Sequence, residues 1–297
     1  MISKQKIYGL IGYPVKHSFS AAMHNAAFSH LGMDKECKYT LFEIKPDDLE
    51  SFLLERTDLA GFNITIPHKV KAKEILEDNF ENASATPDFA TLVGAVNTVG
   101  RNDDGSIWWS NTDAPGFLKA LDCDLGFKKA EQRDALVFGC GGAGRAVLSG
   151  LSWKGLVRNI FIYELSSENQ QAVKDYYSNI PKVWDKLRFI TKEEIAEKIK
   201  TCSLLVNTTP VGMKDDNVRL IDKKLLHADL SVYDVVYNRE TQLIKDAKAK
   251  GLKAVGGLGM LLYQGALAFQ RWTGVNGDQV VDIMRQALEG ELEKCRI

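Results

Sequence analysis

Short apolar runs with the two-residue period of strands alternate with helical patterns along most of the chain. In the first part, strands are predicted at 6–12 (KIYGLIG), 38–44 (KYTLFEI) and 61–66 (GFNITI), each followed by a helical pattern. A DDG turn then joins two short apolar runs within 95–109, which predicts a hairpin. Such alternation of strands and helices is typical of a parallel sheet covered by helices on both faces.

The second part repeats the alternation with the strand–helix order of a dinucleotide-binding domain. Its predicted strands include ALVFG (135–139), NIFIYE (159–164), SLLVNT (203–208) and VYDVVYN (232–238), with helical segments between them. This succession is the βαβαβ order of a Rossmann-type domain.

The last stretch of the chain is purely helical and has no strand of its own to cover. We therefore expect it to return to the first domain. The predicted fold is α/β with two domains: an N-terminal substrate domain completed by the C-terminal helices (1–112 plus 258–297), and a Rossmann dinucleotide-binding domain (113–257).

Composition narrows the class of protein. A length of 297 residues is enough for two domains with separate cores, and a net charge of −1 gives no electrostatic reason to expect nucleic acid or an acidic membrane as partner. No run approaches the roughly 20 apolar residues of a membrane span, and the N-terminus lacks the features of a signal peptide. The five cysteines never form CxxC, which argues against a zinc site or a disulfide framework. We expect a cytoplasmic enzyme or ligand-binding protein without a metal.

A glycine-rich loop follows the first strand of the second part. Residues 139–144, GCGGAG, fit the pattern GxGxxG after an apolar strand and before a helix. In that context the first glycine allows a tight turn, the second lets a pyrophosphate approach, and the third lets the helix pack on the sheet. Amide groups at the helix N-terminus also favour phosphates. The loop, made of Gly139, Gly141, Gly142, Ala143 and Gly144, is a candidate dinucleotide site, although a glycine-rich turn without a ligand fits the same letters.

An acidic residue ends the next predicted strand. Glu164 lies twenty residues beyond Gly144, where an acid can accept hydrogen bonds from the ribose hydroxyls of NAD and would repel the 2′-phosphate of NADP. Leu165 and Ser166 follow, with no arginine close by. The sequence favours NAD over NADP, with a solvated strand-end acid as the alternative interpretation of Glu164.

Four polar clusters fall at predicted strand ends or helix starts in the first domain: 16–20 (KHSFS), 63–69 (NITIPHK), 94–98 (GAVNT) and 110–116 (SNTDAPG). Ligands of open α/β sheets bind beyond the carboxyl ends of the strands, so these clusters predict one cleft for a small polyhydroxylated substrate.

Each of these residues also has an ordinary structural interpretation. Ser18 and Ser20 are suited to capping a helix, and Asp113 is suited to capping the next one. Asn97 would stabilise the hairpin, and Lys69 would be one of several exposed lysines.

Eight motifs in order carry a resemblance to a known family: HSFSAAMHN, NITIPHK, GAVNT, NTD, GCGGAGRA, NTTPVGM, YDVVYN and GGLGMLLYQGALAF. The chain resembles the shikimate/quinate dehydrogenase family over nearly all its length. The resemblance implies reversible hydride transfer between shikimate and 3-dehydroshikimate with a nicotinamide cofactor, a step in the biosynthesis of chorismate and aromatic amino acids.

The resemblance also implies roles for individual residues. Lys69 and Asp113 match the catalytic pair, and Ser18 and Ser20 match the serines that hold the substrate carboxylate. The remaining matches are substrate-contacting positions at Asn63, Thr65, Asn97, Tyr237 and Gln264, and positions near the nicotinamide at Gly257 and Met260.

The sequence departs from the family pattern at three places. Ala21 replaces a proline after the two serines, and Ala114 with Pro115 replaces a glycine after Asp113. NADP-dependent members carry Asn-Arg-Thr where this chain has residues 164–166, Glu-Leu-Ser, so NADP specificity does not carry over. NAD is the expected cofactor, with NADP as the alternative.

Two alternative functions remain at this point. The first is a quinate or dual quinate/shikimate dehydrogenase, since quinate differs by one tertiary hydroxyl. The second is a non-catalytic sensor of dinucleotide and a shikimate-like ligand, which would have no reason to retain both Lys69 and Asp113. We expect a cleft between the domains that closes on ligand, in a monomer or homodimer.

Overall fold

The chain folds into two compact units. The computed structural model describes residues 5–84, 89–127, 133–214 and 218–295. The first unit combines the chain up to Gly116 with Leu262–Cys295, and the second is Phe117–Leu261. The sequence placed both boundaries four residues earlier, so Asp113, assigned there to the second domain, lies in the first unit.

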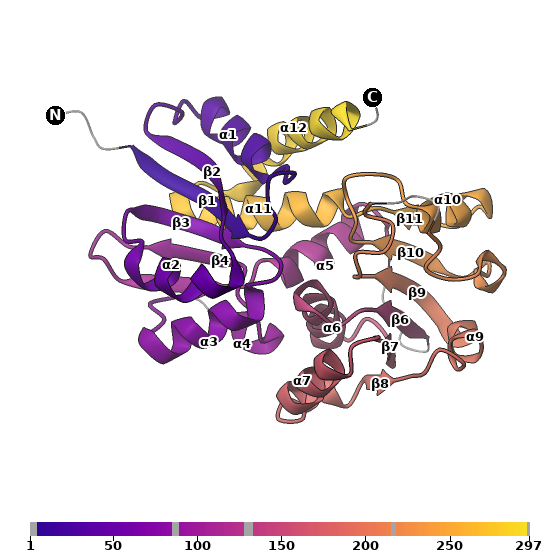
Figure 1. Cartoon of the computed structure of the whole chain (residues 1–297). Helices are drawn as coiled ribbons and strands as arrows, with labels where there is room; N and C mark the ends of the chain where they lie inside the picture. Colours follow the sequence, from indigo (N-terminus) through magenta and orange to yellow (C-terminus); the bar gives the residue numbers. More distant parts are fainter. Residues whose placement is uncertain (1–4, 85–88, 128–132, 215–217, 296–297) are drawn as a thin grey trace. The chain divides into compact units, whose positions relative to one another are not determined.

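The first unit contains a five-stranded mixed sheet in the order β2-β1-β3-β4-β5 (Figure 1). Strand β1 pairs in parallel with β2 and β3, whereas β4 runs antiparallel to both β3 and β5. The carboxyl ends of β1, β2, β3 and β5 therefore lie at the same edge as the amino end of β4. The strands are β1 (Lys6–Gly12), β2 (Cys37–Glu43), β3 (Leu59–Ile64), β4 (Thr98–Arg101) and β5 (Ile107–Ser110).

Helices cover both faces of this sheet. On one face, side chains of α2 and α3 such as Phe52 and Ile75 share a core with Phe62 of β3. On the other face, the Tyr8 ring of β1 contacts Phe28 of α1 and Trp272 of α11, with ring centroids 5.4 and 5.2 Å apart. The helices are α1 (Ser20–His30), α2 (Leu49–Glu55), α3 (Lys69–Asn79), α4 (Phe89–Val93) and α12 (Val281–Lys294). Two further helices belong to both units: α5 (Asp113–Cys123) starts in the first and continues into the second, and α11 (Leu258–Thr273) starts in the second and continues into the first.

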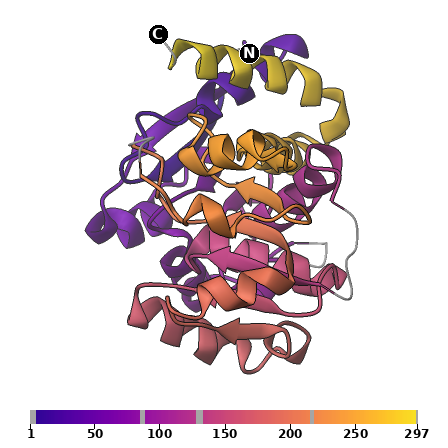
Figure 2. The ribbon, with the colours of Figure 1, turned by 90° about the vertical axis from the view of Figure 1, so that its right-hand side faces the viewer.

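The second unit contains a six-stranded parallel sheet in the order β11-β10-β9-β6-β7-β8 (Figure 2). Residues 135–138 of β6 are all buried, as expected for a parallel strand covered on both faces. Its strands are β6 (Asp134–Phe138), β7 (Ile160–Tyr163), β8 (Leu187–Phe189), β9 (Cys202–Asn207), β10 (Ser231–Asp234) and β11 (Ala254–Val255).

The helices of the second unit alternate with its strands. They are α6 (Gly142–Lys154), α7 (Ser167–Tyr177), α8 (Pro181–Trp184), α9 (Ile195–Lys198) and α10 (Gln242–Ala249). In the described part of the chain there are also four short 3₁₀ turns: Pro46–Asp48, Ile199–Thr201, Lys223–Leu225 and Gly277–Gln279. The predicted α/β class with a Rossmann-type sheet is confirmed. Within the described residues, no helix combines the length and apolar character needed to cross a membrane.

Candidate active site

Three polar clusters of the first unit meet at one edge of its sheet because of the strand directions. Asn63 lies near the carboxyl end of β3, Asn97 immediately precedes β4, and Asp113 follows β5 as the first residue of α5. Lys69 opens α3 after a short turn from β3, and its carbonyl accepts a 2.9 Å hydrogen bond from the Val96 amide. The sequence segments 63–69, 94–98 and 110–116 are thus neighbours in space.

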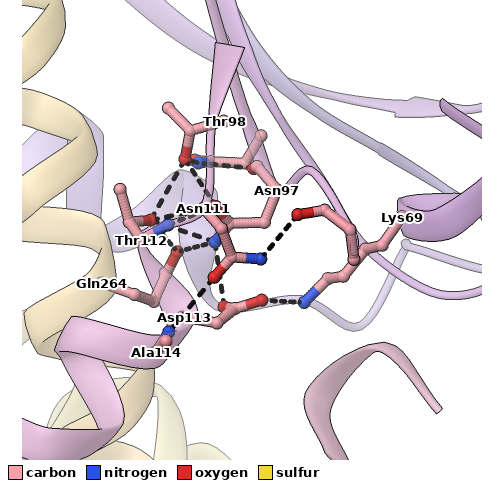
Figure 3. Close-up of polar contacts among 10 residues, drawn as sticks. Lys69, Asn97, Thr98, Asn111, Thr112, Asp113, Ala114 and Gln264 are labelled. Atoms are coloured by element: carbon pink, nitrogen blue, oxygen red, sulfur yellow. Dashed lines mark hydrogen bonds and ion pairs between the residues drawn. The ribbon is translucent and has the colours of Figure 1, made fainter. Parts of the chain in front are cut away.

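Lys69 and Asp113 form a close, shielded ion pair. The Lys69 Nζ lies 2.6 Å from Asp113 Oδ2, and their side chains are only 13% and 7% exposed. The other carboxylate oxygen, Oδ1, accepts a 2.9 Å hydrogen bond from Asn97 Nδ2 (Figure 3). By contrast, the side chain of Lys71, two residues further along α3, is 65% exposed. Lys69 is therefore not one of the solvated lysines of this helix.

Asn97 is the centre of the surrounding hydrogen-bond network. Its Oδ1 accepts a 2.7 Å bond from the Thr112 amide, which directs its Nδ2 towards Asp113. The Nδ2 also lies 3.2 Å from Gln264 Oε1 and 3.0 Å from Thr112 Oγ1 (Figure 3). The network thereby joins β4, the start of α5 and helix α11, and it fixes the amide that holds Asp113.

A second row of buried polar groups lies behind this network. Asn63 Nδ2 donates to the Asn97 carbonyl at 3.2 Å and to Thr98 Oγ1 at 3.0 Å. Its Oδ1 accepts a 2.8 Å bond from the Tyr39 hydroxyl. Asn63 is therefore held in one orientation by β2 and β4, and both of its N–H groups are used within the protein.

The helix-capping interpretation of Asp113 does not hold, because another residue performs it. Asn111 Oδ1 accepts a 3.2 Å bond from the Ala114 amide in the first turn of α5, and Asn111 Nδ2 donates to the Ala95 carbonyl at 3.0 Å. The Asp113 carboxylate is instead directed to Lys69 and Asn97.

The two predicted serines lie where β1 leads into α1. Ser18 Oγ accepts a 3.2 Å bond from the Ser20 amide and lies 3.1 Å from Ser20 Oγ, whereas the N-cap position is Phe19 without a side-chain cap. Thr65 is half-buried just past β3, and its amide donates to Ile11 at the end of β1. No hydrogen bond among the described residues joins these three side chains to the Lys69–Asp113 pair. They share the sheet edge with it.

Sequence reasoning missed three members of the network: Tyr39, Thr98 and Thr112. Thr98 and Thr112 each adjoin a predicted residue within GAVNT and SNTD, and that adjacency was the available signal. Tyr39 lies on an ordinary strand pattern, and nothing in the sequence distinguishes its hydroxyl.

The glycine loop of the second unit has a backbone that requires glycine at two positions. Gly139 has φ +90°, which L side chains rarely adopt. A Cβ at Gly144 would lie 2.6 Å from the Gly139 carbonyl, so only glycine lets α6 start this close to the loop. A Cβ at Gly141 would meet nothing within 4 Å, and α6 begins there without a side-chain cap. The open side of Gly141 and the unshielded amides of α6 fit a pyrophosphate.

Glu164 is fixed at the end of β7 beside this loop. Its Oε2 accepts a 2.9 Å bond from the Cys140 amide, and its Oε1 accepts a 2.9 Å bond from the Ser166 amide. The next side chain, Leu165, is 84% exposed. Glu164 is therefore a positioned carboxylate and not a freely solvated one.

The remaining predicted residues follow the last strands of the second unit. Tyr237 is half-buried three residues after β10, and Gly257 follows β11. A Cβ at Gly257 would lie 2.1 Å from the Val235 carbonyl, which makes glycine obligatory there. The amide of the buried Met260 donates to the Tyr233 hydroxyl at 3.2 Å. Across the described part of the chain, no group of three or more histidine, cysteine, aspartate or glutamate residues is arranged to hold a metal ion.

Comparison with known proteins assigns the family. The model of the shikimate dehydrogenase substrate binding domain matches residues 10–99, and that of the shikimate 5′-dehydrogenase C-terminal domain matches residues 257–289. A curated shikimate dehydrogenase (NADP(+)) from Methanopyrus kandleri is 38% identical over 293 residues, covering 96% of each chain. The chain belongs to the shikimate dehydrogenase family.

Solved structures of this family have the same fold. A shikimate dehydrogenase in complex with NADP⁺ has a TM-score of 0.82 and 33% identity, covering 98% of each chain. A quinate dehydrogenase from Corynebacterium glutamicum in complex with NAD has a TM-score of 0.81 and 28% identity, covering 96% of this chain and 99% of that one. The predicted family is confirmed. The chain is therefore a member of a family of nicotinamide-dependent oxidoreductases.

Proposed function

We propose that this protein is a shikimate dehydrogenase that interconverts shikimate and 3-dehydroshikimate. The observation that carries the proposal is the shielded Lys69–Asp113 pair, 2.6 Å apart and held by Asn97 at the edge where the strands of the first unit end. A structural ion pair would have no need of a network that fixes both carboxylate oxygens and an amide beside them.

The pair is suited to moving the proton of a secondary alcohol. A nicotinamide held by the second unit would supply the hydride acceptor in oxidation and the hydride donor in reduction. In oxidation, Lys69 Nζ acts as the neutral amine, takes the hydroxyl proton and becomes an ammonium. In reduction, that ammonium returns the proton to the carbonyl oxygen. Asp113 orients the ammonium through Oδ2, and its Oδ1 stays bonded to Asn97, so the carboxylate keeps one orientation throughout.

The substrate roles follow the position of each side chain. The Ser18 and Ser20 hydroxyls are proposed to hold the carboxylate of shikimate, and Thr65 and Gln264 to contact its ring hydroxyls. Asn97 is proposed to act both on substrate and on Asp113. Asn63 has only the second acceptor position of its Oδ1 for substrate, because Nδ2 is used within the protein and Oδ1 already accepts from Tyr39. Tyr237 is proposed to contact the carboxylate.

The second unit is proposed to bind the dinucleotide, with NAD preferred. Residues 139–144 would cradle the pyrophosphate, and Gly257 and Met260 would lie near the nicotinamide. The fixed Glu164 carboxylate suits ribose hydroxyls and opposes a 2′-phosphate, and the exposed Leu165 offers no charge in return. The curated relative from Methanopyrus kandleri is named for NADP(+), so this preference rests on residues 164–166 of this chain alone.

Initial rates of cofactor reduction test the proposal, with shikimate and quinate each assayed against NAD⁺ and NADP⁺. We expect the highest kcat/KM for shikimate with NAD⁺. Preference for NADP⁺ would show that positive groups elsewhere hold the phosphate. Absence of turnover in all four assays would reject the dehydrogenase and favour a sensor.

A quinate dehydrogenase is the second candidate, favoured by the fold similarity to the Corynebacterium glutamicum protein. The paired hydroxyls of Ser18 and Ser20 lean towards shikimate, because quinate carries a further hydroxyl at the carbon that bears the carboxylate. A higher kcat/KM with quinate in the same assays would decide for the second candidate.

A further inference from the structure

A polar pocket lies at the opposite edge of the sheet in the first unit. Its cavity volume is about 190 Å³. It is formed where β1 and β3 begin, where the β4–β5 hairpin turns, and where α11 ends. The lining residues are Lys6, Tyr8, Ala60, Arg101, Asn102, Asp103, Trp108, Arg271 and Trp272.

The lining carries more positive than negative charge. Lys6, Arg101 and Arg271 are cationic, and Asp103 is the one acid among the nine lining residues. Lys6 Nζ lies 3.7 Å from Asp103 Oδ1, but the Asp103 side chain is fully exposed. A fully solvated carboxylate at that distance neutralises little charge.

Arg101 is the least compensated of these cations. One guanidinium nitrogen, Nη2, donates to the Arg56 carbonyl at 3.2 Å, whereas its Nε is buried without a hydrogen-bond partner. No ion pair to Arg101 is present among the described residues. Asp58 attracts the Arg101 guanidinium electrostatically, but its carboxylate is paired with Arg56 at 2.7 Å. A partly desolvated guanidinium without a counter-ion is unfavourable unless an anion approaches it.

Hydrogen bonds and a ring contact hold other lining residues in place. The Arg271 guanidinium lies 4.8 Å from the centre of the Trp108 ring and donates to Ser84 Oγ at 2.7 Å. Trp272 Nε1 donates to the Val99 carbonyl at 2.9 Å. Cationic groups held in place bind an anion with less loss of side-chain entropy than flexible surface lysines do.

We propose that this pocket binds a small anion of the phosphate or carboxylate class, at a site separate from the active site. A water molecule occupies about 30 Å³ in the liquid, so the pocket has room for one such anion and a few waters. Pockets for drug-sized ligands are larger, roughly 300–1,000 Å³, which excludes a dinucleotide.

Isothermal titration of the full chain at low ionic strength tests the proposal, with inorganic phosphate and acetate as separate probes. We expect saturable binding of at least one probe, weakened at least tenfold by Arg101→Gln and at least threefold by Lys6→Gln. Lys38→Gln removes the same charge from an exposed position on β2 outside the pocket, and it should leave binding unchanged. Comparing the affinities for phosphate and for acetate decides which class of anion the pocket binds.

The three variants distinguish an anion in this pocket from an anion bound at another place on the protein. Binding that survives both Arg101→Gln and Lys6→Gln would place the anion elsewhere, for example at the glycine loop of α6, and would overturn the proposal. Equal weakening by all three variants would indicate unspecific charge attraction and would overturn it too. Lys6 is exposed, so Lys6→Gln keeps the test valid if Arg101→Gln does not fold.

Discussion

At the scale of single residues, the environment of Lys69 separates it from the other lysines of α3. Its ammonium is shielded and faces a carboxylate that Asn97 holds from the other side. Lys73 is also mostly buried, but it pairs with Glu77 one turn away on the same helix. Lys69 is instead linked through Asp113 to Asn97, outside its own helix.

The buried Tyr39 hydroxyl gives a prediction about positioning. In Tyr39→Phe the Asn63 Oδ1 loses its donor, so the amide that supports Asn97 is less firmly oriented. We expect kcat to fall about threefold to tenfold and stability to fall by about 1 kcal/mol. Steady-state rates and thermal unfolding measure the two effects.

A matched control removes a buried tyrosine hydroxyl that belongs to the second unit. The Tyr177 hydroxyl lies 2.8 Å from Ser149 Oγ in the second unit. Tyr177→Phe should cost similar stability and leave kcat unchanged. Equal kcat in Tyr39→Phe and the parent protein would remove Tyr39 from the positioning network.

At the scale of secondary-structure elements, the glycine loop makes two different demands on neighbouring glycines. Gly144 is required for folding, because a Cβ there would approach the Gly139 carbonyl to 2.6 Å. Gly141 has open space around it and φ −66°, so the protein alone does not require glycine there. Its glycine is explained by a ligand that approaches the backbone.

Alanine substitutions at these positions should therefore differ. We expect Gly144→Ala to lower the melting temperature of the second unit, whereas Gly141→Ala should melt as the parent protein does. Gly141→Ala should raise the KM for the dinucleotide at least tenfold, because its methyl group occupies space meant for the pyrophosphate. Unchanged KM in Gly141→Ala would contradict binding at this loop.

The alternation of strands and helices predicted the fold because both sheets are built from local units with strong patterns. The GxGxxG loop could be recognised because Gly139 and Gly144 occupy backbone positions that no other residue tolerates. The Asn97 network could not be predicted from the sequence in the same way. Its members come from β3, β4, α5 and α11, and only the strand directions place Asn63 and Gln264 beside Asn97.

The structure excludes two of the alternative interpretations of the sequence. For Asp113 the alternative was a cap of α5, but Asn111 performs that task. For Glu164 the alternative was a solvated strand-end acid, but two backbone amides fix its carboxylate. Neither difference was predictable, because each depends on the direction of a side chain and not on its type.

At the scale of the whole molecule, the net charge is only −1. We therefore expect the pH dependence of stability to come mainly from buried titratable groups. His24 is completely buried between aromatic rings of Tyr39, Phe269 and Trp272, and burial lowers its pKa to about 3. Asn63 lies close enough to oppose this shift only in part. In the second unit, burial raises the pKa of Asp234 to about 6, against hydrogen bonds from Thr241, Val236 and Asn207.

The His24 shift predicts acid sensitivity of the first unit. Below pH 6.5, the ordinary pKa of histidine, His24 is protonated in the unfolded chain. In the folded state it does not bind that proton until about pH 3. Stability is therefore lost as the pH falls from 6.5 towards 3, by up to about 1.4 kcal/mol per unit. Asp234 acts in the opposite direction, since its raised pKa makes stability fall as the pH rises from 3.8 to about 6.

Denaturant unfolding between pH 7 and pH 4 checks this prediction. His24→Phe keeps an aromatic ring in place and should lose less stability on acidification than the parent protein does. His30→Phe, at an exposed position on the same helix, should behave as the parent protein. An identical pH dependence in His24→Phe and the parent protein would show that His24 is not the group responsible.

The central claim is that Lys69 moves the proton in the dehydrogenase reaction, and the kcat of Lys69→Met tests it most directly. Lys71→Met, at an exposed position of α3, is the matched control, and circular dichroism checks that both variants fold. We predict a fall in kcat of about 10²–10⁴-fold for Lys69→Met, with a smaller change in KM, and near-normal rates for Lys71→Met. A folded Lys69→Met protein with kcat within a few-fold of the parent protein would contradict the claim.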